Sequence, residues 1–271
     1  MTQNLINVRI WGDYACFTRA EMKVERVSYP IITPSAARGI LEAIFWKPQM
    51  FYLIDSIKVI KKGVWTSFRR NEVTKRISLS QAKSVMAGTG EISTIKAGGG
   101  ADDATQRNML ALKNVEYIIT AEVALSELGK HSNQVLPKYK EEIERRVRGG
   151  KCFHRPSLGV REFSADFDWV DNPNDFSPET GWTESLGLML YDVFSHQERA
   201  VGFRFLDGED YADNQTPLFA TEMPKKKKRK PLTDGVLVKP SASFFRAEII
   251  ENVMDCSPHR IEIIQQKGGV T

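Results

Sequence analysis

The fold is decided by residues 33–60, which read TPSAARGILEAIFWKPQMFYLIDSIKVI. Thr33 suits the N-cap of a helix, and Pro34 suits its first turn because the N–H that proline lacks has no helical partner there. Apolar residues then recur every three or four positions, which is typical of a helix with one buried face. These residues are Ala37, Ile40, Leu41, Ile44 and Phe45. Pro48 ends the helix, and the apolar run over 51–60 predicts a mostly buried strand.

An earlier strand is expected near the beginning of the chain. Val8 and Ile10 alternate with polar neighbours, the Trp-Gly-Asp sequence at 11–13 interrupts this pattern, and residues 14–17 resume it. A strand, a helix and a second strand in this order are typical of an α+β protein.

Two more elements continue this order. Residues 115–123 alternate apolar and polar side chains, which predicts a half-buried strand. A basic helix is expected at about 137–148, because Pro137 suits its first turn and Gly149 its end.

The order of elements predicts an α+β fold with a ferredoxin-like domain over 1–163 and a β-rich region over 164–271. In the second region, residues 186–194 and 201–205 are strand candidates. Residues 78–108 are rich in glycine and have no clear period, so we expect an irregular loop there.

The composition is that of an ordinary globular protein, with 271 residues, 41% of them hydrophobic and 27% charged. No apolar run approaches the ~20 residues that cross a bilayer, and residues 1–4 lack the order of a signal peptide. We therefore expect a cytoplasmic protein without a membrane segment. Cys16, Cys152 and Cys256 lie far apart, so buried thiols are expected rather than a zinc site or a disulfide.

Charge is strongly segregated along the chain. Residues 1–76 carry 13 Lys and Arg against 6 Asp and Glu, and residues 138–161 carry 8 against 3. Residues 162–223 carry only 2 basic residues against 14 acidic ones. If the two basic blocks meet on one face, they form a surface suited to phosphates; the alternative is scattered, solvated charge.

A basic run, KKKKRK, occupies residues 225–230 within a loop expected at 224–231. Such a run between prolines could be a solvated loop, an arm that contacts RNA, or a nuclear localisation signal. We favour the first two interpretations, because nothing else in the sequence indicates a eukaryotic protein.

Three stretches carry a family resemblance. Residues 11–29 read WGDYACFTRAEMKVERVSY, residues 33–48 read TPSAARGILEAIFWKP with RRNEV at 69–73, and residues 152–163 read CFHRPSLGVREF. They resemble the Cas five family of type I-C CRISPR systems, a branch of the RAMP superfamily. Beyond residue 206 the likeness weakens, and the basic run looks like an insertion.

The resemblance implies a ferredoxin-like domain with a β-rich C-terminal extension, in a prokaryotic cytoplasm. It also implies metal-independent cleavage of CRISPR repeat RNA at the base of its hairpin, without a cofactor, giving 5′-hydroxyl and 2′,3′-cyclic phosphate ends. The family then keeps the 5′ handle of the guide RNA beside the backbone and large subunits of the surveillance complex (Cascade). Target DNA near the PAM is a further possible partner that the resemblance does not decide.

Metal-free cleavage needs a group that takes the proton of the attacking 2′-hydroxyl, a group that protonates the departing 5′-oxygen, and a cation. The resemblance implies that these roles belong to a Tyr or His near the end of the first helix and to a Lys-His pair before the basic helix. Here the helix position holds Phe45, which cannot transfer a proton.

Two registers remain open for the Lys-His pair. Spacing from the later stretches favours Lys138 and Tyr139, whereas residue identity favours Lys130 and His131. A tyrosine has a reference pKa of ~10 and a histidine ~6.5, so the first register predicts poor cleavage and the second allows it. A binding-only protein with a degenerate nuclease site is the alternative function.

Cations and aromatic side chains in the matching stretches are candidates for RNA contacts, since phosphates need only well-placed cations and unpaired bases stack on aromatic rings. They are Tyr14, Lys23, Arg26, Tyr29, Arg38, Trp46, Lys47, Arg69, Arg70, Arg145, Arg146, His154 and Arg161. For each aromatic residue a place in the core is the competing interpretation. His196 and His259 are expected to be surface residues without partners.

Overall fold

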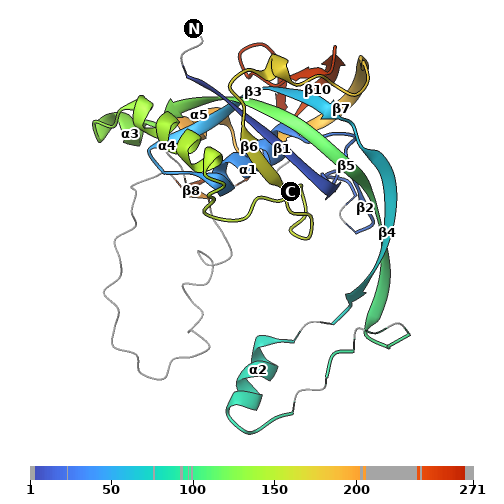
Figure 1. The fold of residues 1–271 in the computed structure, drawn as a ribbon. Coiled ribbons are helices and arrows are strands. Elements are labelled where there is room, and N and C mark those ends of the chain that lie inside the picture. Colours follow the sequence, from blue (N-terminus) through green and yellow to red (C-terminus); the bar gives the residue numbers. More distant parts are fainter. Residues whose placement is uncertain are drawn as a thin grey trace.

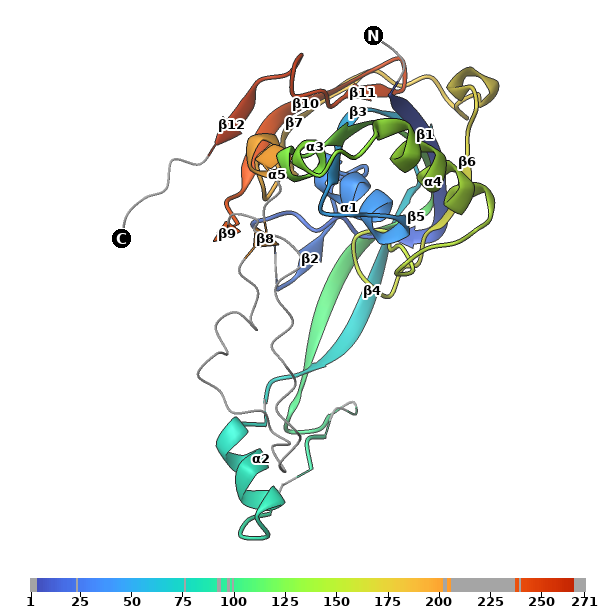
Figure 2. The ribbon, with the colours of Figure 1, turned by 90° about the vertical axis from the view of Figure 1, so that its left-hand side faces the viewer.

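The computed structural model describes residues 4–265 except 23, 76, 92–93, 97, 99, 202–203, 206–236 and 239. It is a mixed α/β protein with few helices and one large, mostly antiparallel sheet (Figures 1 and 2). The described strands of this sheet are β1 (Leu5–Ala15), β2 (Arg26–Val27), β3 (Met50–Lys61), β4 (Val64–Val73), β5 (Ala104–Leu125), β6 (Asp166–Trp169), β7 (Glu184–Asp192), β10 (Ser243–Ile250), β11 (Val253–Asp255) and β12 (Ile263–Gln265). The helices are α1 (Pro34–Ile44), α2 (Leu79–Met86), α3 (Glu127–His131), α4 (Leu136–Arg148) and α5 (His196–Val201), with a 3-10 turn at Pro173–Asp175.

The main path of the sheet runs β12-β10-β11-β3-β5-β1-β6, while β2 and β4 also pair with β5 and β7 pairs with β10. A separate pair joins β8 (Arg204–Phe205) and β9 (Leu237–Val238). Along the chain, α1 connects β1 to β3, and α4 connects β5 to β6. The C-terminal strands continue the sheet because β11 pairs with β3.

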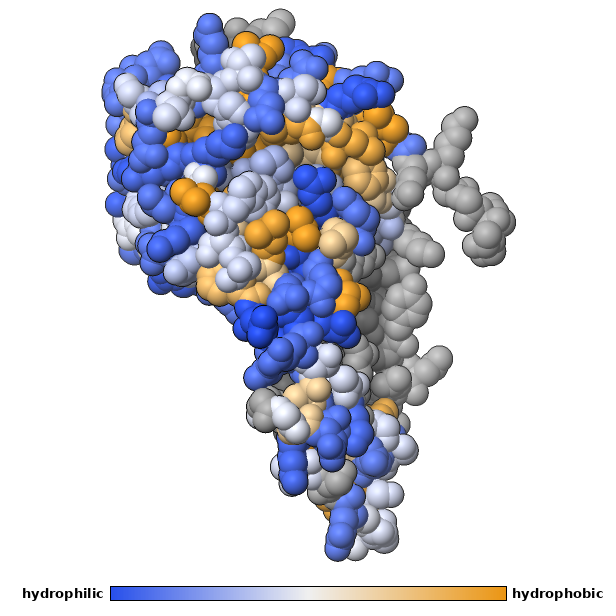
Figure 3. All heavy atoms as spheres, turned by 90° about the vertical axis from the view of Figure 1, so that its right-hand side faces the viewer, coloured by the Kyte–Doolittle hydropathy of each residue, from blue (hydrophilic) through white to orange (hydrophobic). Residues whose placement is uncertain are grey.

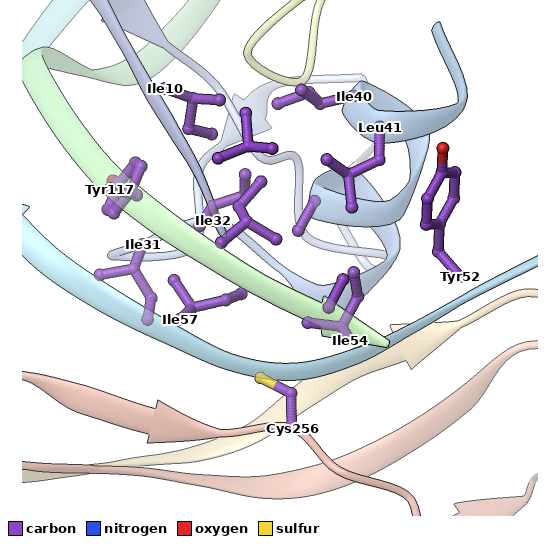
Figure 4. Close-up of a cluster of buried hydrophobic side chains, with 14 of the residues drawn as sticks. Ile10, Ile31, Ile32, Ile40, Leu41, Tyr52, Ile54, Ile57, Tyr117 and Cys256 are labelled. Carbon is purple, nitrogen blue, oxygen red and sulfur yellow. The ribbon is translucent and has the colours of Figure 1, made fainter. Parts of the chain in front are cut away.

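Helix α1 confirms the predicted caps and buried stripe. The Thr33 hydroxyl accepts the N–H of Ala36 at 3.2 Å, and the helix ends at Ile44, before Pro48. In Figure 4, Ile40 and Leu41 lie between this helix and the sheet residues of β1, β3 and β5. The predicted strand over 51–60 is confirmed as β3.

The basic helix is confirmed as α4, with Gly149 at its C-cap. Tyr139, Ile143 and Val147 form its buried seam, as their spacing indicates. Within the described residues, no helix is both long and apolar enough to cross a bilayer.

The expected interruption at 11–13 is wrong, because β1 continues through it and pairs with β5. Gly12 is needed there for space: a Cβ atom would lie 2.6 Å from a methyl carbon of Leu158 and 2.9 Å from the carbonyl oxygen of Ser164. The glycine therefore marks a close approach of another segment rather than a turn.

Residues 78–108 are also more regular than expected. Ser78 and Gln81 form a capping box that begins α2, and residues from Ala104 already belong to β5. The strand candidate at 201–205 is corrected as well, since Val201 ends α5. Arg204–Phe205 form a strand, and residues 202–203 lie outside the described residues.

A long hairpin of β4 and β5 projects from the body and carries α2 near its tip (Figures 1 and 2). In the view of Figure 3 the surface of this arm is mostly hydrophilic. The inner half of β5 pairs with β1 and β3, so the same strand forms the centre of the sheet and one side of the arm.

Candidate nucleic-acid interface

Residues 149–165, called here the connecting segment, join α4 to β6 and touch three other elements. The N–H of His154 donates to the carbonyl of Ala43 near the end of α1, at 2.9 Å. Farther along, the carbonyl of Leu158 accepts the N–H of Cys16 at 2.9 Å, just after β1. The connecting segment thus runs from α4, past the C-terminal end of α1, to β1.

The far part of this segment is held close to the sheet. Glu162 forms an ion pair with Arg70 of β4 at 3.1 Å. Gly159 has φ +90°, and a Cβ atom there would lie 2.0 Å from the carbonyl oxygen of Cys16. Only a glycine fits this approach without a shift of the backbone.

Cations from both basic blocks border the connecting segment. Its own exposed basic side chains are Lys151, Arg155 and Arg161. The adjoining elements add the exposed Lys47, after α1, and the exposed Arg69, which lies on the opposite face of β4 from Arg70, the partner of Glu162. Trp46, Phe153 and His154 are exposed aromatic side chains along the same path. Exposed cations and exposed aromatic side chains therefore occur together along the connecting segment and the elements beside it. These cations are called here the cation row, and the combination suits single-stranded RNA.

The ends of α1 and α4 meet through aromatic rings. The ring centroids of Phe45 and Tyr139 lie 6.4 Å apart, and the guanidinium of Arg146 lies 5.2 Å from the Phe45 ring. Tyr139 is 4% exposed, and its hydroxyl donates to the side-chain oxygen of Gln134 at 3.1 Å. Burial raises the pKa of Tyr139, so this hydroxyl holds its proton even more firmly than a free tyrosine.

The second candidate pair, Lys130 and His131, lies on α3 and is exposed. Lys130 forms an ion pair with Glu127 at 2.7 Å. Nδ1 of His131 lies 2.8 Å from the carbonyl oxygen of Glu127. Because a carbonyl only accepts, this contact assigns the proton of the neutral ring to Nδ1 and leaves Nε2 free to take a proton.

Both candidate pairs flank the chain that follows α1. The Ser126 hydroxyl, at the N-cap of α3, donates to the carbonyl of Pro48 at 2.8 Å, and Gly129 packs so closely on Gln49 that a Cβ atom would lie 2.2 Å from its carbonyl oxygen. Gln134 joins the two helices, since its N–H donates to Gly129 and its side chain also accepts from Lys138 at 3.2 Å. The two registers therefore belong to one folded unit rather than to separate sites.

Two predicted RNA contacts are wrong, because the side chains lie inside the protein. Arg38 is 8% exposed, and its guanidinium donates to both carboxylate oxygens of Asp192 and to Glu42. Tyr29 is 3% exposed, and its hydroxyl accepts the N–H of Leu190 at 3.3 Å. Both are structural residues.

The remaining candidates differ in the contacts that their side chains already make within the protein. Tyr14 packs edge-on against Phe68, with centroids 5.0 Å apart. Arg145 and Arg146 both pair with Glu142, so a phosphate would compete with that carboxylate. The other partly buried candidates are Arg26 on β2 and Arg70, which also pairs with Glu72. Lys23 and the basic loop at 224–231 lie outside the described residues.

Other side chains were missed from the sequence. Gln134 belongs to no recognised motif. Phe153 lies in the stretch 152–163 but is not among the predicted RNA contacts, although it is 75% exposed and its ring lies 4.4 Å from that of His154. The expectation that His196 and His259 have no partners is wrong, because their rings lie 6.5 Å apart. Burial, with the charges of Arg199 and His259, lowers the pKa of His196.

The chain is similar to known proteins in sequence and in fold. A family model described as "CRISPR-associated protein (Cas_Cas5)", of the Cas5d type, matches residues 5–256. A protein of Mannheimia succiniciproducens named "CRISPR pre-crRNA endoribonuclease Cas5d" is 44% identical over 210 residues, which are 74% of this chain and 90% of that protein. A protein of Thermus thermophilus with the same name is 43% identical over 188 residues, which are 69% of this chain and 72% of that protein.

A solved structure named "Crystal Structure of CRISPR-associated Protein" matches the fold with a TM-score of 0.54. The match covers 93% of this chain and 90% of that chain, at 19% identity. At this level of identity the likeness concerns the fold alone.

Proposed function

Because this chain belongs to the CRISPR-associated Cas5 family, among the Cas5d proteins, we propose that it binds CRISPR repeat RNA and cuts the precursor of the guide RNA. The observation that carries this proposal is the connecting segment, which joins the ends of α1 and α4 to β4 along a row of exposed cations. Phosphate binding needs such a row, and the candidate proton-transfer groups lie near one end of it.

The proposed reaction uses no metal. The 2′-oxygen forms a bond to the neighbouring phosphorus, the bond from phosphorus to the 5′-oxygen breaks, and the products end in 2′,3′-cyclic phosphate and 5′-hydroxyl. His131 takes the 2′-proton on Nε2, and the ammonium of Lys130 or Lys138 gives a proton to the departing 5′-oxygen. Lys130 and Lys138 offset the extra negative charge of the phosphorane. The orientation of the His131 ring by Glu127 supports this choice over Tyr139.

The test is incubation of the purified protein with its own repeat RNA in EDTA. A single cut with a 2′,3′-cyclic phosphate end is the expected result. If the RNA is fully bound but stays intact, the proposed cleavage is contradicted and the proposed RNA binding is retained. RNA bound no better than an unrelated strand of equal length would contradict both.

A binding-only protein is the second candidate function. It is favoured by Phe45, which occupies the helix position where the resemblance implies a Tyr or His, and by the buried Tyr139 beside it. Neither ring is suited to move a proton near neutral pH. Intact, saturated RNA in the EDTA experiment is the result that selects this alternative.

We further propose a ferredoxin-like domain over 1–163, extended by the β-rich region 164–271. The β-α-β-β-α-β order of β1, α1, β3, β5, α4 and β6 supports a ferredoxin-like arrangement, as does the sheet order β3-β5-β1-β6. Its last strand, β6 (Asp166–Trp169), begins just beyond the boundary at residue 163. The proposed partners are the guide RNA handle, the backbone and large subunits of a type I-C surveillance complex, and target DNA near the PAM, in the cytoplasm of a prokaryote. Co-purification with tagged partner subunits and guide RNA tests this assembly.

A further inference from the structure

A cavity of about 300 Å³ opens where the connecting segment passes the edge of the sheet. Its lining residues come from β1, from the beginning of the connecting segment, and from β6 with the residue before it. They are Trp11, Gly150, Cys152, Arg155, Ala165, Asp166 and Phe167. We propose that this cavity holds one unpaired base of the bound RNA and selects bases that carry an amino group. This inference rests on the proposed function and names a subsite of it.

The size and the walls of the cavity suit a single base. Its volume lies at the lower end of the range for small-molecule sites, ~300–1,000 Å³, so it can take a flat ring but not a folded stretch of chain. Trp11 is partly exposed and provides aromatic surface on the face that it shares with Asp166, its partner on β6. Phe167 pairs with Ile10 and packs against the core, so it supports the wall from the other face. Bases that leave their stack are typically received by such rings.

Trp11 is held in place before any ligand arrives. The guanidinium of Arg9 lies 4.6 Å from the centre of its ring. Arg9 is itself fixed by an ion pair with Glu116 at 2.6 Å, and Glu116 is buried. A stacking ring that is already ordered loses little entropy when a base binds.

The polar groups of the lining determine which base fits. Arg155 donates to Asp166 at 3.1 Å, and both side chains are exposed. That bond uses one donor and one acceptor, so the carboxylate can still accept from an amino group while the guanidinium donates to a neighbouring ring nitrogen or carbonyl. Adenine, cytosine and guanine carry an exocyclic amino group, whereas uracil carries none.

The surroundings indicate a nucleotide of RNA rather than a free metabolite. Lys151 and Arg155 are exposed next to the cavity and belong to the same cation row as Arg161. A base inside the cavity would therefore keep its own phosphates near basic side chains.

A cysteine provides a direct readout. Cys152 lines the cavity and is partly exposed, whereas Cys16 and Cys256 are fully buried and serve as internal references. We expect CMP, AMP and GMP to slow alkylation of Cys152 more than UMP does. Equal protection by all four nucleotides, or none, would contradict the base selection. Asp166→Leu, which has no acceptor for an amino group, should make CMP, AMP and GMP protect Cys152 no better than UMP does.

Affinity for repeat RNA gives the second readout. Trp11→Leu should weaken binding about tenfold, as expected for the loss of one stacking contact. Trp65→Leu is the matched control, because Trp65 is also exposed, at 45%, but lies on β4 away from the cavity. Thermal unfolding by circular dichroism checks that both variants fold.

Repeat RNAs with single abasic nucleotides complete the test. At one unpaired position the abasic RNA should bind the wild type about tenfold more weakly and should show no further loss with Trp11→Leu. Two results would contradict the base site but not the proposed RNA binding. In the first, Trp11→Leu binds intact RNA as tightly as the wild type. In the second, the loss of affinity from Trp11→Leu adds to the loss from the abasic nucleotide at every position. If the wild type does not prefer repeat RNA, the proposed function itself fails.

Discussion

Phe45 and Tyr139 face each other with ring centroids 6.4 Å apart, one at the end of α1 and the other in the first half of α4. The family resemblance implies proton-transferring side chains at these positions, and here the pair forms an aromatic contact instead. Proton transfer must then come from another group, and His131 on the adjacent α3 is the candidate with a suitable side chain.

His131→Gln should lower the rate of RNA cleavage about 100-fold, because glutamine cannot take a proton, and should leave RNA affinity nearly unchanged. Tyr139→Phe is the matched variant, since it removes only the hydroxyl that donates to Gln134. Single-turnover cleavage of labelled repeat RNA measures both. The reverse outcome, with Tyr139→Phe inactive and His131→Gln active, would select Lys138 and Tyr139 as the pair.

The pH dependence of cleavage separates the same two assignments. Burial raises the pKa of Tyr139 above its ordinary value of 10.0, so a reaction that used its phenolate would still accelerate above pH 10. We expect the cleavage rate to have levelled off before pH 10, which excludes the phenolate of Tyr139 as the base. A rate that keeps rising tenfold per pH unit through pH 10 would instead support Tyr139.

Asp192→Asn should lower the free energy of unfolding by about 3 kcal/mol at pH 7, because Arg38 and Arg199 would remain buried without their carboxylate. Burial alone would raise the pKa of Asp192, but the two arginines outweigh it and hold this pKa below the ordinary value. A lowered pKa adds stability above the unfolded pKa of ~3.9, and this stability is lost as the pH falls through the folded pKa.

Urea unfolding measures this at pH 7 and pH 3. The difference in the free energy of unfolding between the wild type and Asp192→Asn should be smaller at pH 3 than at pH 7. Lys62→Gln is the control, because Lys62 pairs with Glu184 at the surface and its loss should cost less than about 1 kcal/mol. A difference that stays constant between the two pH values would contradict the role of the charge.

Arg161→Gln and Arg69→Gln should each weaken RNA binding and reduce the slope of log K against log salt by about 0.7, the value for one phosphate contact with a single strand. Arg246→Gln provides the comparison, because Arg246 is also exposed but lies on β10 among the C-terminal strands. Fluorescence anisotropy over a salt series measures the slopes. The same reduction in all three variants would mean that the cation row has no special role.

Gly159→Ala should destabilise the protein by about 1–3 kcal/mol through its left-handed backbone alone, with a further loss from the clash with Cys16. It should also weaken RNA binding, because the connecting segment would shift. Gly181→Ala is the control, since nothing lies within 4 Å of a Cβ atom there. Unchanged RNA affinity in a measurably destabilised Gly159→Ala would show that the segment does not position the cations.

Local signals in the sequence account for the elements that were predicted well. Thr33, Pro34 and the apolar stripe define α1 within a dozen residues, and Gly149 marks the end of α4. The capping box of Ser78 and Gln81 is an equally local signal, and α2 could have been found from it.

The errors concern contacts between distant residues. Arg38 is internal only because Asp192, 154 positions later, folds against it. Tyr29 is internal because Leu190 does the same. For the candidate site, the sequence names both Lys pairs, but their shared location depends on Gly129 packing against Gln49. No pattern along the chain encodes that approach.

The single strand β5 has a mechanical consequence. With 22 residues it spans roughly 70 Å, and it stays one paired strand through Asn114, whose φ of +59° marks the point where the pairing passes to β4 and the arm begins. A pull on α2 is transmitted along one backbone to Tyr117 and Ile119 at the centre of the protein. A single-residue insertion where β5 leaves the body would reverse which face of the arm each side chain occupies, while the pairing with β1 and β3 stayed intact.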